Sequence, residues 1–540
     1  MTDHKPEPVQ PVPDEPAALP LPLVLLYVAS SILLALTQGL GQGFVSTNIA
    51  QFAGDLGITK TQASWLVAAY MIPRASLTLM LIKLRTQYGL RRFAEVSIAA
   101  YVVVAFAAIW IEDFRSALIV QFLSGVAGAP LSSLAFLYML DVLPQQWKLR
   151  FGLPIALAFI TSGSAIARIV SPALLGDGGL TWVHLTTLGL AMVCLGLVYH
   201  LPLRAVRHAM VIESMDLVSF ALIAFGFGGV VVAFIMGPIH WWTAEPWIGW
   251  LLVSSVAALT VAVIIELHRK EPLLDIRWLV TPAMLHLTAM LFLFRLILSE
   301  QSSGAPRMFS MLGVAPSQMT VLFSIIVTGA IMGGLACVAW IRPGRERQFH
   351  LAAAVLIAIG AWMDSHVTLL TRPEQMYVSQ AIIAFAGMLF MPPAMMAGLM
   401  AALRKGPNYI LSFVIVFLLT QSIGGIIGSG LFTTLINHRR AFHYQVLLEQ
   451  LTATSAQAGS AIARTAQSMG PMLQDGALRT AQGVSNLAAS ASKQAYLLAY
   501  NDAYFLIFLI ATAAGCALLV LLLRDWLTSD NQRTPAINPA

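Results

Sequence analysis

Charged residues are scarce along this 540-residue chain. Asp, Glu, Lys and Arg make up 10% of it, whereas a soluble domain carries about 25%. Hydrophobic residues account for 58%, and the mean hydropathy is +0.78. This balance excludes an ordinary globular enzyme, a disordered protein and a protein that binds nucleic acid. It indicates an integral membrane protein whose main surroundings are the lipid bilayer.

Cysteine and the short motifs of enzymes are also rare or missing. Three cysteines, Cys194, Cys337 and Cys516, lie in apolar stretches and indicate no disulfide framework. The sequence contains no HExxH, no GxSxG and no clustered metal ligands. Glycine patches such as "GAIMGG" lack the ending of a nucleotide-binding loop, so we interpret them as helix-packing surfaces. We therefore predict no catalytic residue, no metal and no cofactor.

Long apolar runs are frequent instead. A membrane helix needs about 20 predominantly apolar residues, and fourteen stretches meet this requirement. They predict an all-α integral membrane protein with fourteen transmembrane helices. The expected spans are 21–47, 62–82, 93–112, 116–140, 152–175, 181–202, 214–238, 246–267, 281–302, 317–340, 350–368, 375–402, 409–435 and 502–523.

Basic residues are concentrated in alternate loops. With both termini on one side, the segments of that side hold 19 Lys and Arg. The short loops of the other side hold four, which are Lys60, Arg115, Arg307 and Arg372. Because cytoplasmic loops carry the excess of basic residues, both termini are predicted to be cytoplasmic. Residues 1–20, which are rich in proline, and 524–540 are then cytoplasmic tails.

One predicted outer segment, 436–500, is much longer than the other loops. It is rich in Ala, Gln, Ser and Leu, which favours helix over coil. Its string "FHYQVLLEQL" is expected to extend span thirteen above the membrane. Two interpretations remain open for this segment: a solvated cap without a function, or a docking surface for a partner outside the membrane.

Three strings of the sequence are distinctive: "AGDLGITKTQASWLVAAYMI" (53–72), "GSGLFTTLINHRRAFHYQVL" (428–447) and "QAYLLAYND" (494–502). With the fourteen spans and the single long outer loop, they resemble the fourteen-span drug:proton antiporter branch of the major facilitator superfamily, of the EmrB and QacA type. The resemblance covers nearly the whole chain after residue 20.

This resemblance implies the major facilitator fold. Two six-helix bundles, 21–202 and 280–523, would surround a central cavity, with two additional spans and a linker in 203–279. It also implies a bacterial inner (plasma) membrane location. Segment 436–500 would then meet a periplasmic adaptor that passes substrate to an outer-membrane channel.

The signature motifs of the family are present in outline. The inner loop between spans two and three reads "IKLRTQYGLRR" and keeps Gly89, Arg91 and Arg92. In span five, "SPALLG" keeps Pro172. The resemblance implies that these four residues take part in gating.

Three charges of the family pattern are missing. Gly41 stands where span one has an aspartate, Thr86 where the inner loop has an aspartate, and Gln121 where span four has an arginine. The aspartate of the inner loop latches the two bundles together, so here the latch must be weaker or differently built.

Three arginines fall inside predicted spans: Arg74, Arg168 and Arg295. Each costs roughly 2.5–3.5 kcal/mol to insert, so each needs an explanation. One interpretation is structural, with each arginine bound to a carboxylate or to the carbonyls of a broken helix. The other is that the three arginines bind an anionic group of the substrate, since the guanidinium pairs well with carboxylates.

Titratable groups near the spans are few. Glu300 is the leading candidate for proton coupling, and it is offset from Arg295 around the helix. His286 and His184 are the next candidates, because histidine titrates near neutral pH. Each histidine is also a reasonable hydrogen-bonded packing residue.

These features favour a secondary active transporter, which is not an enzyme. We expect it to export hydrophobic small molecules, including drugs and organic anions such as fatty or aromatic acids, in exchange for protons by alternating access. An uncoupled facilitator, or a transport-inactive scaffold or sensor with the same fold, is the alternative.

Overall fold

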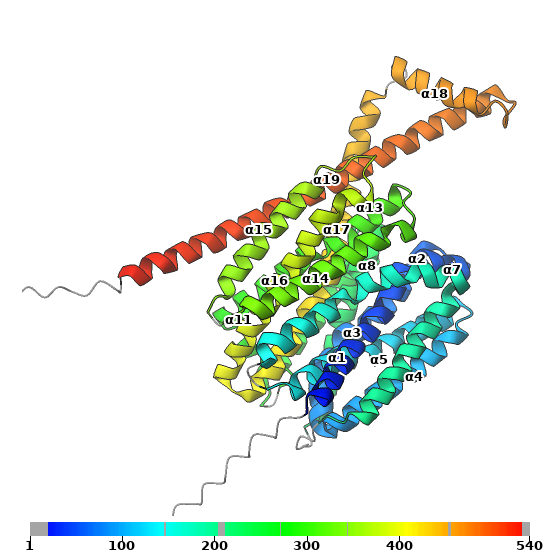
Figure 1. Ribbon diagram of the computed structural model, residues 1–540. Helices are drawn as coiled ribbons and strands as arrows, with labels where there is room; N and C mark the ends of the chain where they lie inside the picture. The colour runs from blue at the N-terminus through cyan, green and yellow to red at the C-terminus, as the bar shows by residue number, and fades with distance from the viewer. Residues whose placement is uncertain are drawn as a thin grey trace, which may run out of the picture.

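The computed structural model describes residues 20–144, 147–203, 211–270, 272–342, 344–451 and 455–531. Most of the predicted N-terminal tail and part of the C-terminal tail lie outside these residues. Throughout the described residues the secondary structure is helical. The all-α prediction is therefore confirmed (Figure 1).

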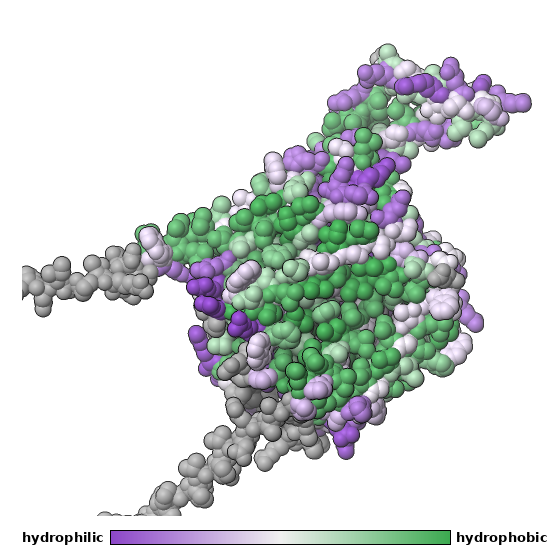
Figure 2. All heavy atoms as spheres, in the orientation of Figure 1, coloured by the Kyte–Doolittle hydropathy of each residue, from purple (hydrophilic) through white to green (hydrophobic). Residues whose placement is uncertain are grey.

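Thirteen helices within the described ranges are long and apolar enough to cross a membrane. The eleventh predicted span, 350–368, corresponds to α15, Glu346–Asp364, which does not meet that criterion. Its charged first turn lowers its hydropathy, yet it packs beside two long helices of the bundle, α16 and α19. Apolar side chains cover most of the bundle face in Figure 2, as expected for a surface in lipid.

The first half of the chain forms one group of helices. Within it, α1 packs against α5 and α7, α3 packs against α5, and α4 packs against α5 and α7. These helices are α1 (Leu21–Thr47), α3 (Lys60–Tyr88), α4 (Leu90–Ala107), α5 (Phe114–Val142) and α7 (Leu153–His200), with the short α2 (Ile49–Asp55) between α1 and α3.

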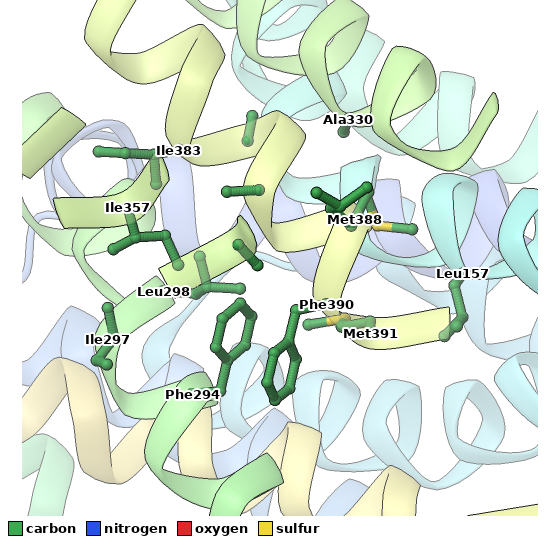
Figure 3. Close-up of a cluster of buried hydrophobic side chains, with 14 of the residues drawn as sticks. Leu157, Phe294, Ile297, Leu298, Ala330, Ile357, Ile383, Met388, Phe390 and Met391 are labelled. Atoms are coloured by element: carbon green, nitrogen blue, oxygen red, sulfur yellow. The ribbon is translucent and has the colours of Figure 1, made fainter. Parts of the chain in front are cut away.

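The second half forms another group. Here α14 packs against α16, α15 against α16 and α19, and α17 against α11 and α19. Its elements are α11 (Pro282–Leu298), α12 (Glu300–Ser303), α13 (Ala305–Met311), α14 (Thr320–Trp340), α15, α16 (Tyr377–Lys405), α17 (Pro407–Gln450), α18 (Ala456–Ser468) and α19 (Gly476–Asn531). A large apolar core fills this group, and Phe294 stacks on Phe390 within it at a ring-centroid distance of 3.5 Å (Figure 3).

Two further helices, α8 (Ser214–His240) and α9 (Pro246–His268), separate the two groups in sequence. They pack on each other, and α8 also lies against both α3 and α17. A short helix, α10 (Ile276–Leu279), leads from α9 into α11. The groups also meet directly, where α7 packs along α14.

Three predicted spans differ in form from a simple helix. Spans five and six share the element α7, which consists of two helices joined at Gly178 and Gly179, where the backbone is not helical and the φ of Gly179 is +65°. Span nine is broken instead: α11 ends at Leu298, and two short helices follow around Gly304. The break places residues 299–304 at a depth where irregular backbone is tolerated only inside protein or beside a cavity.

The long predicted outer segment is helical, as expected. Helix α17 continues to Gln450, α18 follows after a short connection, and α19 begins at Gly476. Together they form a helical hairpin that projects from one end of the bundle (Figure 1). We call residues 436–500 the outer hairpin.

Glycine permits a close helix contact in the first group. Gly39 of α1 faces Gly163 of α7, and a Cβ added at either glycine would lie within 2.6 Å of the other backbone. Small residues at such crossings let membrane helices approach until their backbones touch, which replaces the hydrophobic driving force that lipid does not supply.

We expect Gly163→Leu to lower stability by about 1–3 kcal/mol, because the side chain would force α1 and α7 apart. Gly189→Leu, in the second helix of α7, is the matched control, since nothing lies within 4 Å of its Cβ position. Thermal unfolding in detergent compares the two variants. Equal melting temperatures would show that the close crossing does not matter.

Candidate functional site

Arg74 belongs to a buried polar cluster between α1 and α3. Its guanidinium donates to the amide oxygen of Gln42. Gln38, in the orientation that satisfies both ends of its amide, accepts from Arg74 Nη1 and Nη2 at 2.5 and 2.9 Å and donates to Ser132 at 2.8 Å. The partners of Arg74 are therefore uncharged. They are side-chain amides rather than the backbone carbonyls near Pro73.

Arg295 lies on α11 and is bound to α17. Its Nε donates to the carbonyl of Gln421 at 3.1 Å. The side chain lies along Gly424 and Gly425, where an added Cβ would come within 3.1 and 2.7 Å of it. The two glycines therefore make the room for this arginine. Arg74 of the other group is near enough for the two positive charges to repel each other.

Arg168 crosses from α7 to the second group of helices. Its Nη2 donates to the carbonyl of Ser302 at 3.2 Å, and its guanidinium lies 5.3 Å from the ring centroid of Phe323. Arg307 of α13 is close enough to repel Arg168 and donates to Thr433 at 2.6 Å. Sequence analysis placed Arg307 in an outer loop, because the break in span nine was not apparent.

The four arginines share one electrostatic property. Among the residues that the structure describes, no carboxylate lies within ion-pair distance of Arg74, Arg168, Arg295 or Arg307. Their partners are amides, hydroxyls and backbone carbonyls, none of which cancels a positive charge. The region where the two groups meet is consequently rich in uncompensated positive charge.

The side chain of Glu300 points away from these arginines, toward α15 and α16. Glu300 is the first residue of α12, it is 2% exposed, and its Oε1 accepts from Gln380 Nε2 at 3.0 Å. The same Nε2 donates to Asp364 Oδ2 at 2.8 Å. Arg295 is bound to α17 instead, and the helix is broken between Arg295 and Glu300, so the two side chains do not form an intrahelical pair. The sequence alone does not associate Asp364 or Gln380 with Glu300, because they come from two other helices.

The two candidate histidines lie far from this acid pair in the fold. His184, in the second part of α7, lies with its ring 6.1 Å from that of Phe52. His286 is exposed near the start of α11, fourteen residues before Glu300, which is about 21 Å along a helix. Neither histidine is brought into contact with the arginines or with Glu300 in the described structure.

A small cavity of about 40 Å³, lined by apolar side chains and a few polar ones, lies inside the first group of helices. Gly41, Gln121, Tyr70 and His184 are among its lining residues. Gln121 Oε1 and the Tyr70 hydroxyl are buried without a hydrogen-bond partner, and the cavity has room for about two or three water molecules. Gly41 and Gln121 thus line one space, so the two charges that the family pattern would place there are absent together.

A larger groove, of about 520 Å³, lies elsewhere. It runs along the outside of the second group between α15 and α19, with Trp362 and Phe508 among its apolar lining residues. No ionisable side chain apart from the Cys516 thiol lines it. Its position on the outside of the helices and its apolar lining suit lipid chains.

Of the residues predicted to gate, Gly89 has a clear conformational role. Its φ of +79° joins α3 to α4 in a conformation that side chains disfavour. Arg91 forms an exposed pair with Glu95 at 2.8 Å, and Arg92 is exposed. Pro172 lies within α7, beside Ser171, which donates to Asn48 at 2.7 Å. These placements leave gating as a prediction.

A buried charge cluster occupies the end of α3 that leads into this loop. Lys83 contacts both carboxylate oxygens of Asp216 at 2.7 and 2.8 Å. Arg269 donates to the same Asp216 at 2.5 Å, to Glu213 at 2.9 Å and to Glu266 at 3.2 Å. Burial alone would lower the pKa of Arg269, but these hydrogen bonds hold it above its ordinary value.

The cluster joins α3 to the additional helices rather than to the second group. At the other end of α8, Trp242 Nε1 donates to Thr434 at 2.8 Å, and Asn437 donates to the Pro238 carbonyl at 3.1 Å. Helix α8 is therefore bound to the first group at one end and to α17 at the other. Helix α8 thus connects the first group to α17 of the second.

We expect Asp216→Asn to lower stability by about 3–5 kcal/mol, because Lys83 and Arg269 would then face a neutral amide in a buried site. Glu95→Gln, which breaks the exposed Arg91 pair, is the control and should cost about 0–1 kcal/mol. Thermal unfolding in detergent measures both. A shift no larger than that of the control would show that the cluster does not stabilise the fold.

Comparison with known proteins identifies the fold. No protein-family model matches the chain, and no curated protein sequence does. Among solved structures, a bacterial homologue of the human lysosomal transporter Spinster, in an inward-facing and unoccupied conformation, is 14% identical with a TM-score of 0.52, covering 94% of this chain and 99% of its own.

Two further structures agree. The human organic anion transporter MFSD10 (TETRAN) is 12% identical with a TM-score of 0.52, covering 91% of this chain and 98% of its own. The proton:xylose symporter XylE, of the major facilitator superfamily, is 12% identical with a TM-score of 0.52, covering 90% and 95%. The chain is therefore a multi-pass membrane protein with the fold of major facilitator transporters. The fourteen-span drug:proton branch stays a prediction.

Proposed function

We propose that this protein is a secondary active transporter that exports hydrophobic organic anions in exchange for protons, by alternating access between its two groups of helices. The observation that carries the proposal is the set of four arginines with neutral partners where the groups meet. Retaining such charges in an apolar bundle is expensive. An anionic substrate group offers the compensation that the described side chains do not supply.

The arginines are bound to helices of both groups, so their spacing would change if the groups moved relative to each other. Arg74 is bound to α1 within the first group, Arg295 to α17 within the second, and Arg168 reaches from the first group to the second. An anion between Arg74 and Arg295 would relieve the repulsion between them, and it would be released when the groups separate. Among the structural neighbours, MFSD10 is described as an organic anion transporter and XylE as a proton symporter, which agrees with both parts of the proposal.

The test uses the full chain in proteoliposomes with an imposed pH gradient. The substrate probe is a naphthalene sulfonate, which stays ionised and does not cross the bilayer as a neutral acid. A naphthalene trimethylammonium compound is its cationic counterpart. We expect sulfonate transport driven by the gradient, with little transport of the cation.

Arg295→Gln and Arg74→Gln should each weaken the apparent affinity for the sulfonate roughly ten- to a hundredfold, since a charged hydrogen bond contributes about 1.5–3 kcal/mol. Arg372→Gln, in an exposed loop, is the control. Transport of the cation instead would contradict the choice of substrate. Transport without dependence on the pH gradient would indicate a facilitator, and no transport by folded protein would indicate a scaffold or sensor.

The outer hairpin is proposed to dock a periplasmic adaptor that leads to an outer-membrane channel, with the protein in a bacterial inner membrane and both termini in the cytoplasm. Support comes from apolar side chains exposed on it: Leu478 is 56% exposed and Val484 50%. These lie on α19, whose other side packs against α18, where Gly483 touches Ile462.

Replacing Leu478 and Val484 by serine should abolish export from intact cells while leaving transport in proteoliposomes unchanged, because only the cell contains the adaptor. Ser485→Ala, a neighbouring exposed position, is the control. Full export by the double variant would favour the interpretation of the hairpin as a solvated cap.

A further inference from the structure

Three helices bring two carboxyl groups together in the core of the second group. Glu300 begins α12 after the break in span nine, Asp364 is the last residue of α15, and Gln380 lies in α16. Their exposed fractions are 2%, 1% and 0%. Both carboxylates accept from the single Gln380 Nε2, at 3.0 and 2.8 Å, so the two accepting oxygens lie less than 6 Å apart.

No positive side chain compensates these acids in the part of the chain that the structure describes. The side chains that face them are Tyr504 of α19 together with Ser379 and Gln380 of α16, while Ser303 of α12 is bound to Ser429 of α17 at 2.5 Å. Two ionised carboxylates at this separation in an apolar core repel each other strongly, and one of them takes up a proton instead.

Two buried polar atoms at the site have no hydrogen-bond partner. They are Gln380 Oε1 and the Tyr504 hydroxyl, and both residues are fully buried. The position of a Cβ on Gly304 would lie 3.1 Å from that hydroxyl and 3.2 Å from Glu300 Cγ, so the hydroxyl and Glu300 are neighbours. An unpaired acceptor in a core needs a donor. A protonated carboxyl group is a donor, whereas an ionised one is only an acceptor.

We propose that Glu300 and Asp364 form one proton-binding site in which the two carboxyl groups share a single proton, with Gln380 and Tyr504 as positioning residues. The site favours a proton over a metal cation, because an N–H group rather than an oxygen points at both carboxylates. This inference deepens the proposed proton coupling at Glu300 by adding the second acid and the bridging amide.

The position of the site links it to the movement of the two groups. Ser302, two residues after Glu300 in α12, accepts the hydrogen bond of Arg168 from the first group. Gln301 Nε2 donates to the carbonyl of Gln380 at 3.3 Å. Separation of α7 from α12 therefore acts on the same short helix that carries Glu300, and the proton is held or released according to how the two groups meet.

The test measures protonation directly, without a transported substrate. Infrared difference spectroscopy follows the C=O stretch of protonated carboxyl groups in the reconstituted full chain as pH is changed. Glu374→Gln, an exposed acid, is the control. We expect one titrating band in the wild type that is unchanged in this control.

If the two carboxyl groups share one proton, the proton affinity of each acid depends on the charge of the other. In Asp364→Asn the proton affinity of Glu300 should fall at least tenfold, because its negative neighbour is gone, and Glu300→Gln should do the same to Asp364. The double variant should lose the band. Independent titrations, with each midpoint unmoved by the other substitution, would overturn the proposal.

Gln380→Met gives a second route that leaves both acids in place. Gln380→Met removes N–H donors to both carboxylates, which stabilise the ionised form, and one acceptor, Oε1, for the protonated form. Because hydrogen bonds to a charged group are the stronger ones, the titration midpoint should rise. A midpoint that stays at the wild-type pH would contradict the role of the amide. A shift of the wild-type band when Na⁺ replaces K⁺ at constant pH would identify a sodium site and overturn the choice of a proton.

The proposed function and this inference can fail separately. If the shared titration is observed but sulfonate is not transported, the acid pair stands and the substrate assignment falls. If sulfonate is transported but the acids titrate independently, the transporter stands and the shared site falls. In the coupled case, Glu300→Gln should lose uptake driven by a pH gradient while retaining sulfonate exchange without a gradient.

Discussion

The cost of leaving a charge uncompensated in an apolar bundle governs the arrangement of this protein. Only a tenth of its residues are charged. Most ionisable groups within the bundle can therefore be sorted into those with an opposite charge beside them and those without one. The Lys83, Asp216 and Arg269 cluster is the compensated case, in which opposite charges meet and hold helices together. The arginines near the meeting surface and the acid pair are the uncompensated cases, and they point to a ligand and to a proton.

The uncompensated positive charges and the uncompensated acids lie in different parts of the helix bundle. Arg295 is directed to α17 and Glu300 to α15 and α16, although only five residues separate them. The break after Leu298 allows this, because α12 starts a new helix whose side chains point differently from those of α11. Keeping Arg295 and Glu300 apart prevents an internal ion pair that would compensate both charges.

Helix α8 joins the two groups in a chain whose inner loop lacks the aspartate of the antiporters that it resembles. Thr86 occupies that position, but Lys83, three residues earlier, is bound to Asp216 at the start of α8. The far end of α8 is bound to α17 through Trp242 and Asn437. The additional helices therefore connect the two groups. Any movement of one group relative to the other would have to bend or tilt α8.

Composition and hydropathy alone determined the class, the spans, the helical outer hairpin and the scarcity of charge, because these depend on properties that add along the chain. Arg74, Arg168, Arg295 and Glu300 could be selected because a charge in a span is conspicuous by itself. Only the tertiary structure decided their partners. Asp364 and Gln380 meet Glu300 through three helices distant in sequence, which no local pattern encodes. The break near Gly304, by contrast, has a local signal, because Gly304 and Pro306 both disfavour a continuous helix.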